Sequence, residues 1–192
     1  GSEMCIRDSY WYDVNDNKKT WTNKQIVQRS CGKFRREWET SSMKEKSYTP
    51  ENYPILRYGD VLLMLAEAEN EAHQGPTDLA YECINEIRQR AGISKLEGLS
   101  YTDFQQAVRD ERARELCFES LRKYDLVRWG IYVEAVHDKL GAATQDKRWA
   151  TGNQFIGARD YAARTQEKHQ FLPIPTKELD VNGKLEQNKY WQ

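Results

Sequence analysis

Three groups of residues in this 192-residue chain have types and spacings that could carry out chemistry. The first is Glu134-x-x-His137, the spacing with which di-iron proteins place two ligands on one face of a helix. Such a site needs a second pair of this kind and two further glutamates, and only Asn70-x-x-His73 comes close. We therefore expect a structural role for these residues, with no bound metal.

The second group is a run of carboxylates. Glu111, Glu115 and Glu119 recur every four residues, and a pair of carboxylates is what a glycosidase uses as acid and base. Arg112 and Lys123 lie among them, which favours ion pairing over catalysis. The sequence contains no Gly-x-Ser-x-Gly, phosphate-loop or His-Glu-x-x-His motif. We therefore expect a protein that is not an enzyme.

Four cysteines form the third group. They include no Cys-x-x-Cys pair, and no histidine stands at a metal-binding distance along the chain. Cys83 and Cys117 occupy apolar positions of expected helices, which favours buried thiols. No apolar stretch precedes Cys5, so we do not take it for a lipidation site. These residues predict no cofactor.

The carboxylates belong to residues 111–130, a stretch around which the other elements must be arranged. Its apolar residues recur at spacings of three and four, as on one stripe of a helix: Ala113, Leu116, Cys117, Leu121 and Tyr124. An exposed ion pair on a helix contributes only ~0.2–0.5 kcal/mol, too little to explain so many charges. Two interpretations remain, a solvated helix face or partly buried ion pairs. In the second, Arg122, Asp125 and Arg128 tie the helix end to a neighbouring element.

Periodicity and capping residues predict helices on either side. One helix is expected from Arg57 to Gln74, with residues 61–66 buried all round and glycine and proline after its end. A cap at Thr77 should open the next helix, which ends at Gly92. Because their connection is so short, these two helices should pack antiparallel.

A capping box of Thr102 and Gln105 is expected to open the third helix, which runs into residues 111–130 and is followed by a helix over residues 131–140. Residues 141–170 show no clear period and predict a long loop. Residues 171–175 must be extended, because two prolines exclude a regular helix. The predicted fold is mainly α, with helical hairpins of tetratricopeptide-like type, long irregular loops and an extended C-terminal strap.

Composition limits the possible partners. Lys and Arg total 29 against 30 for Asp and Glu, so the formal net charge of −1 creates no strong field for nucleic acid. No run of ~18 apolar residues predicts a transmembrane helix, and no secretory signal is visible at the start. Residues 1–9 read as a cloning or adaptor-derived remnant, so we expect the native chain to enter at about Tyr10, in the middle of a protein.

Residues 10–50 are rich in aromatic and polar residues without a sustained period, apart from short strands expected at 25–28 and 33–38. Indole and phenol rings on irregular segments can stack on the apolar faces of sugars, while nearby polar groups bind the hydroxyls. The alternative is that the rings cover the helical core. The candidate ligand-binding residues are Trp11, Tyr12, Trp21, Trp38 and, from residues 141–170, Trp149.

Four stretches, in this order, resemble the SusD/RagB family of outer-membrane nutrient-binding lipoproteins. Ser120 departs from the pattern, since the family usually has glycine there. The matching stretches are Arg57-Tyr58 with Leu62–Ala68, Asn85 with Arg90-Ala91-Gly92, the run from Glu111 to Trp129, and Phe171–Pro175 with Gln187-Asn188.

The resemblance implies that residues 10–192 are the C-terminal domain of a longer protein without its N-terminal half. It implies binding of a glycan or other nutrient at the cell surface, and delivery to a TonB-dependent β-barrel transporter in the outer membrane. It also implies a lipid anchor outside this chain. The alternative is a helical-repeat scaffold that binds a protein and no sugar, and a carbohydrate-active enzyme is a weaker third possibility.

Overall fold

The structure is a computed structural model that describes residues 10–12, 17–20, 33, 40, 49–50, 52–140 and 153–192. The chain divides into two compact units, Gly1–Arg122 and Lys123–Gln192. It is mainly helical, which confirms the predicted fold class. Among the described residues, no helix combines the length and the apolar character that crossing a membrane requires.

The first unit begins with a small hairpin that the sequence did not predict. Strands β1 (Tyr10–Tyr12) and β2 (Lys18–Thr20) pair antiparallel, with Trp11 opposite Lys19 and Tyr12 opposite Lys18. The strands expected at 25–28 and 33–38 lie outside the described residues, except for Lys33.

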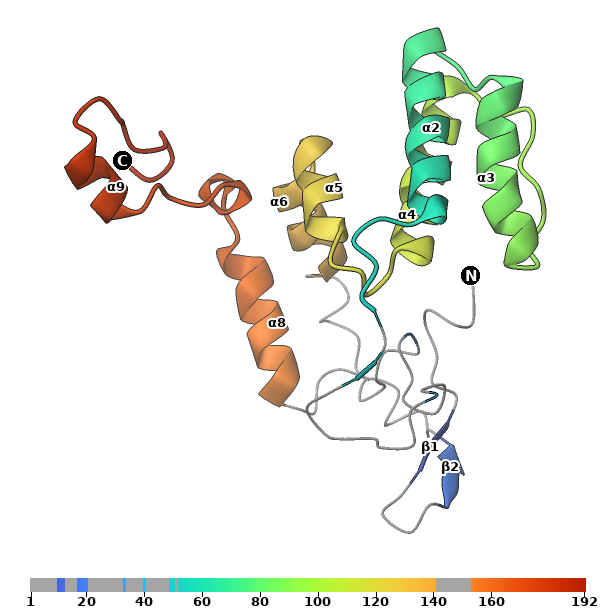
Figure 1. The fold of residues 1–192 in the computed structure, drawn as a ribbon, viewed down its shortest axis with the longest axis horizontal. Helices are drawn as coiled ribbons and strands as arrows, with labels where there is room; N and C mark the ends of the chain where they lie inside the picture. Colours follow the sequence, from blue (N-terminus) through green and yellow to red (C-terminus); the bar gives the residue numbers. More distant parts are fainter. Residues whose placement is uncertain are drawn as a thin grey trace. The chain divides into compact units, whose positions relative to one another are not determined.

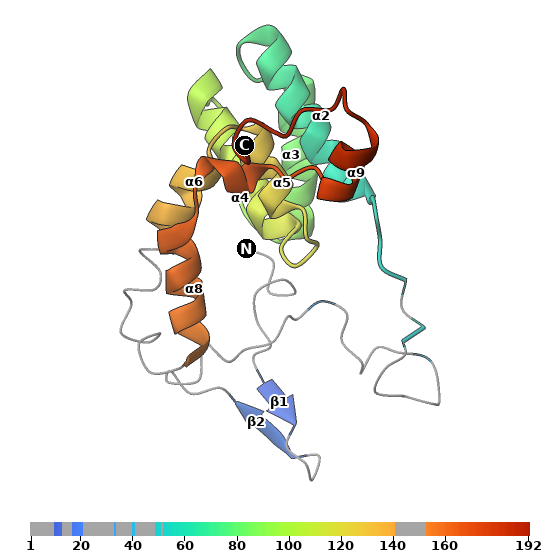
Figure 2. The ribbon, with the colours of Figure 1, turned by 90° about the vertical axis from the view of Figure 1, so that its left-hand side faces the viewer.

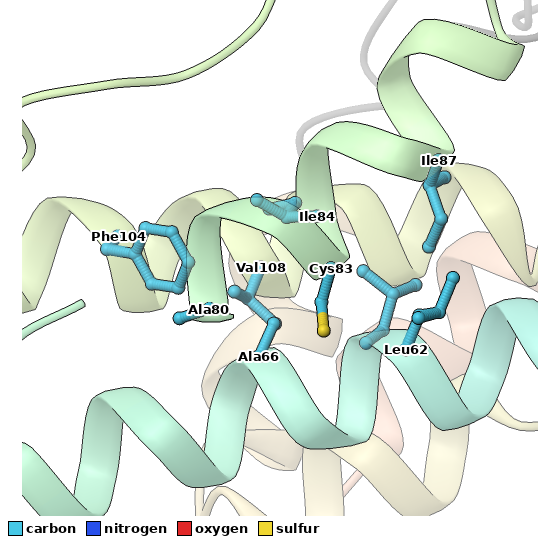
Figure 3. Packing of buried hydrophobic residues seen from close by; sticks show 9 residues of the cluster. Leu62, Ala66, Ala80, Cys83, Ile84, Ile87, Phe104 and Val108 are labelled. Carbon is cyan, nitrogen blue, oxygen red and sulfur yellow. The ribbon is translucent and has the colours of Figure 1, made fainter. Parts of the chain in front are cut away.

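Three helices carry the core of the first unit. Helix α2 (Tyr58–His73) packs against both α3 (Asp78–Arg90) and α4 (Tyr101–Glu115), and the short connection makes α2 and α3 antiparallel as predicted (Figure 1). Figure 3 shows side chains from α3 pointing towards α2 within this core. The buried cluster comprises Leu62, Leu63 and Ala66 from α2, Ala80, Cys83, Ile84 and Ile87 from α3, and Phe104 and Val108 from α4.

The prediction that residues 61–66 are buried all round is wrong. Leu62, Leu63 and Ala66 are buried, but Val61 and Leu65 remain 39% and 38% exposed. Only one stripe of α2 faces α3 and α4, because a helix turns about 100° per residue. A second apolar stripe therefore faces away from the core of this unit.

Local hydrogen bonds set the ends of these helices. Thr77 Oγ1 accepts from the backbone N–H of Ala80 over 3.1 Å, which confirms the predicted cap of α3. The capping box at Thr102 and Gln105 is wrong, since Ser100 caps α4 by accepting from Asp103 N over 3.2 Å. Two candidate capping hydroxyls stand two residues apart, and backbone geometry selects the first.

Residues 111–130 do not form one helix. Helix α4 ends at Glu115, a turn follows, and α5 spans Arg122–Arg128. Phe118 and Ser120 adopt left-handed backbone angles, with φ of 65° and 60°, and such residues cannot continue a right-handed helix. The expected apolar stripe from Ala113 to Tyr124 is therefore divided between two helices.

The second unit is built on shorter helices. Helix α6 (Tyr132–Ala135) continues into the π-helical segment η3 (Val136–Leu140), which confirms the helix expected over residues 131–140. Helix α8 spans Asn153–Arg164, so the long loop predicted for residues 141–170 is wrong for this part (Figure 2). Ala162 of α8 is buried against Tyr132 and Val136, so tertiary packing stabilises this helix.

The C-terminal segment contains the extended strap. After the 3-10 helix η4 (Glu167–Gln170), residues 171–175 are extended as predicted, and the short helix α9 (Thr176–Val181) follows. The side chain of Gln187 holds this strap. Its Oε1 accepts from Ile174 N over 2.9 Å, and its Nε2 donates to Ile174 O over 3.0 Å.

Candidate functional site

The aromatic residues that the sequence singled out are only partly covered by the structure. Trp11 and Tyr12 lie on β1, where only the backbone is described. Trp21, Trp38 and Trp149 lie outside the described residues. Their role in ligand binding therefore stays a prediction, and the site must be sought among the described side chains.

The carboxylates of the charged stretch are buried and paired. Nε and Nη2 of Arg57, the residue before α2, donate to the two carboxylate oxygens of Glu119 over 2.7 and 2.8 Å. Nη1 of Arg57 donates to Oε1 of Glu115 over 2.5 Å, and Arg90 of α3 pairs with Oε2 of Glu115 over 2.5 Å. Lys33 Nζ donates to Glu119 Oε1 and to the backbone oxygen of Glu115.

The cations change how Glu119 titrates. Burial by itself raises the pKa of Glu119, but hydrogen bonds and charge from Arg57 and Lys33 outweigh it and hold the pKa below its ordinary value. Burial likewise acts to lower the pKa of Arg57, but the hydrogen bonds that Arg57 donates to Glu119 and Glu115, and the charges of these carboxylates, outweigh it and raise that pKa. Arg57 and Glu119 are therefore both charged at neutral pH.

Two further pairs complete the pattern in the first unit. Arg88 Nη1 donates to Glu111 Oε2 over 2.9 Å, and Arg112 Nη1 donates to Asp60 Oδ1 over 2.7 Å. The interpretation as partly buried ion pairs is confirmed for Glu111, Glu115 and Glu119, whereas Asp125 pairs with Arg128 of its own helix α5 over 3.0 Å. A buried carboxylate held by cations is a poor proton donor, so these residues suit a structural role rather than general acid catalysis.

The Glu-x-x-His pair also has structural surroundings. Glu134 is exposed, and Nε2 of His137 lies 2.8 Å from the carbonyl oxygen of Thr165, to which it donates. Within residues 52–140 and 153–192 and the few described before them, no group of three or more His, Cys, Asp or Glu residues could hold a metal ion.

An open pocket of about 480 Å³ lies in the second unit. This volume is within the range of ~300–1,000 Å³ that small-molecule sites occupy. Helix α8 contributes Asp160, Tyr161 and Arg164 to its lining, and the strap contributes Phe171, Leu172 and Pro173. The other lining residues are Lys123, Gly157, Thr165, His169 and Trp191.

The aromatic walls of the pocket are held in place by contacts behind them. The indole N–H of Trp191 is shared between the carbonyl oxygens of Lys168 and Phe171, each 3.0 Å away. The Phe171 ring stacks on Tyr190, with centroids 6.2 Å apart and planes 3° from parallel. The His169 ring meets the indole edge to face, with centroids 6.2 Å apart. These rings can therefore receive a ligand with little loss of side-chain entropy.

Tyr161 is fixed through its hydroxyl group. The hydroxyls of Tyr161 and Tyr132 form a hydrogen bond, and the Tyr132 side chain is buried behind it. Burial first, and then this hydrogen bond, raise the pKa of Tyr132 to about 12. The Tyr132 phenol is therefore neutral at physiological pH, and the half-exposed Tyr161 ring lines the pocket in front of it.

The polar groups of the pocket are mostly donors. Lys123 and Arg164 carry positive charges, and Asp160 is the acidic residue in the lining. Nδ1 of His169 accepts from the backbone N–H of Gln166 over 2.8 Å. The neutral ring must then carry its proton on Nε2, which makes that nitrogen a donor.

Few features of the sequence point to this pocket. Residues 171–175 were recognised as extended, whereas Tyr161 and Arg164 lie in a stretch that was predicted to be a loop. Trp191 was not singled out, because it lies alone in polar sequence and acquires its role through carbonyl groups about 20 residues earlier. Lys123 was assigned to the charged stretch. Only the fold brings these residues to one pocket.

The helical hairpins place the chain among mainly helical proteins of tetratricopeptide-like architecture. Comparison with known proteins then identifies the family. The profile of the SusD family matches residues 6–191. The chain belongs to the SusD family, which confirms the resemblance seen in the sequence.

Two relatives from Formosa agariphila are similar in sequence. SusD-like protein P25 is 40% identical over 139 residues, covering 70% of this chain and 23% of the relative. SusD-like protein P2 is 29% identical over 148 residues, covering 71% of this chain and 25% of the relative. The chain thus spans about a quarter of the length of these relatives.

Solved structures support the same fold. A SusD homologue from Bacteroides thetaiotaomicron matches 97% of this chain, with a TM-score of 0.74 and 30% identity, over 39% of its own length. A SusD superfamily protein from Bacteroides vulgatus matches 76% of this chain, with a TM-score of 0.55 and 30% identity, over 29% of its own length.

Proposed function

We propose that this chain is the C-terminal part of a non-catalytic surface lipoprotein that binds a glycan or other nutrient. Residues 10–192 belong to that protein in this proposal, and residues 1–9 are foreign to it. Membership of the SusD family supports a role in binding glycans or nutrients. The observation that carries the proposal is the pocket of the second unit, where fixed aromatic rings lie beside hydrogen-bond donors. Such a combination suits a sugar, because its ring faces are apolar and its edges are polar.

The test is a binding screen of the 192-residue chain against neutral and acidic oligosaccharides, followed by calorimetry on each hit. We expect binding that Trp191→Ala weakens about tenfold or more, because the indole forms one wall of the pocket. The length of the bound oligosaccharide should stay unchanged after long incubation. Shortening of the oligosaccharide would contradict the non-catalytic role, and binding that Trp191→Ala leaves intact would place the site elsewhere.

We further propose delivery of the ligand to a TonB-dependent β-barrel transporter in the outer membrane, with a lipid anchor outside residues 10–192. Family membership supports the delivery. The length of the relatives leaves room for an anchor, since about three quarters of each lies beyond the matched region. Expression of the full-length gene in its source cell, with a tag on each protein, tests it. Co-purification with the transporter and incorporation of a labelled fatty acid are the expected results.

A second candidate function is a scaffold that binds a protein partner. The exposed apolar stripe of α2 favours it, with Tyr58 66% exposed besides Val61 and Leu65. A scaffold predicts that Leu65→Ser abolishes retention of the partner while Trp191→Ala has no effect. Sugar binding predicts the reverse pattern for the two variants.

A further inference from the structure

We infer that the pocket of the second unit selects a sugar that carries an oxyanion, a carboxylate or a sulfate group, over a neutral sugar. The inference rests on the proposed function, because it names the class of ligand for the same pocket. It is carried by the balance of charges and of hydrogen-bond donors and acceptors in the lining.

Two cations and one carboxylate line the pocket. Within the part of the chain that the structure describes, neither Lys123 nor Arg164 forms an ion pair, although Lys123 Nζ lies 5.4 Å from the centroid of the Tyr132 ring. Asp160 balances one of the two positive charges. An uncompensated positive charge therefore remains beside the pocket, and the planar fork of arginine can bind two oxygens of a carboxylate or sulfate at once.

Two neighbouring residues strengthen this preference. Because Nδ1 of His169 accepts a backbone hydrogen bond, the ring carries its proton on Nε2, and that nitrogen can only donate. Lys168 places its Nζ 5.2 Å from the centroid of the Trp191 ring, which adds positive charge beside the wall. The next carboxylate along this segment, Glu167, accepts a hydrogen bond from Gln170.

The walls indicate that the anion belongs to a larger, partly apolar molecule. One face of Phe171 is covered by Tyr190, while Phe171 and Trp191 both line the pocket together with Leu172 and Pro173. A small inorganic anion would use the donors and leave the walls uncovered. A neutral sugar would use the walls and leave the positive charge uncompensated. A sugar ring with an oxyanion uses both.

Matched pairs of ligands test the inference. Oligogalacturonate is compared with its methyl ester, and a sulfated galactan fragment with its desulfated form, by calorimetry on the 192-residue chain. We expect at least one acidic ligand to bind tenfold or more tightly than its neutral partner. Arg164→Gln should lose most of that difference, and raising the salt concentration should reduce it.

The control variant is Arg159→Gln, which removes the same charge from an exposed residue of α8 outside the pocket lining. It should keep the preference for the acidic ligand, and circular dichroism should show both variants folded. Equal binding of acidic and neutral partners would overturn this inference and leave the proposed function standing. Failure of every sugar, acidic and neutral, to bind the folded chain would count against both, and inorganic sulfate binding as tightly as the sulfated sugar would overturn the role of the walls.

Discussion

At the scale of single residues, Glu119 shows how the charged stretch stabilises the first unit. It is 6% exposed and accepts hydrogen bonds from a residue that precedes α2 and from Lys33, far earlier in the chain. Breaking a buried ion pair is costly, because the remaining charges are left without compensation in a medium of low dielectric constant. Glu119 therefore ties three distant segments together.

We predict that Glu119→Gln destabilises the protein. The amide keeps one acceptor but turns a donor towards Arg57 or Lys33. The Arg57 side chain is 25% exposed, so water screens part of the loss, and we expect about 2–3 kcal/mol. For a chain of this length that lowers the melting temperature by about 5–10 °C. Glu82→Gln, at an exposed position of α3, is the control and should change the melting temperature by less than about 1 °C.

The lowered pKa of Glu119 also predicts a pH dependence. Because its pKa is lower in the folded protein than the ordinary 4.5, the folded state holds its proton less tightly than the unfolded state. This contribution to stability is fully present above the ordinary value and is lost as pH falls through the lowered pKa. Urea unfolding between pH 3 and 7 should show a decline that is shallower in Glu119→Gln. Parallel declines in both proteins would rule out Glu119 as the titrating group.

At the scale of elements, the turn between α4 and α5 decides the course of the charged stretch. Ser120 has φ of 60°, a conformation in which its Cβ is crowded and which glycine adopts readily. We predict that Ser120→Gly raises the free energy of unfolding by about 0.5–1 kcal/mol, as measured in urea.

Gly130, two residues after the end of α5, allows the opposite substitution, from glycine to a residue with a Cβ. It has φ of 69°, and no heavy atom lies within 4 Å of the position that a Cβ would occupy. Gly130→Ala should therefore lower the free energy of unfolding by about 1 kcal/mol, through backbone strain alone. If both substitutions changed stability in the same direction, the backbone angles could not be their cause.

The side chain of Gln187 holds the strap at Ile174 from the C-terminal segment. We predict that Gln187→Ala removes both hydrogen bonds to Ile174. The free energy of local opening of the strap should fall by about 1–2 kcal/mol. Hydrogen exchange of the Ile174 amide should accelerate about tenfold as a result. Gln192→Ala is the matched control, since Gln192 donates to the carbonyl oxygen of Gln187 and makes no such bond to the strap. Unchanged exchange in Gln187→Ala would mean that other contacts hold the strap.

At the scale of the whole molecule, the chain combines two kinds of unit. The first unit has a helical core and buried ion pairs, and both stabilise it. The second unit has a smaller core and carries the pocket. The relatives are about four times as long as the matched region. Binding by the longer protein therefore involves, in our proposal, residues beyond this chain.

The sequence by itself determined the family, the helical class and the local features. Three local features follow from residues that are neighbours in the sequence: the cap of α3 at Thr77, the stop of this helix at Gly92 and the extended strap. Capping, left-handed backbone angles and proline geometry each act over only a few residues. Buried ion pairing was one of the two interpretations that the sequence left open for the charged stretch. The break in the helix after Glu115 could not be predicted, because the apolar spacing continues across the turn. In that turn Ser120 has φ of 60°.

Only the tertiary structure decided which residues meet. Arg57 pairs with carboxylates 58 and 62 residues later, and no local pattern specifies such partners. Helix α8 forms where sequence periodicity predicted a loop, because Ala162 packs against Tyr132 and Val136. The pocket brings Lys123, Arg164 and Trp191 together from segments that were each interpreted separately. Local geometry depends on residues that are neighbours in the sequence, whereas packing and charge compensation depend on residues that are neighbours in space. The pocket is formed by residues of the second kind.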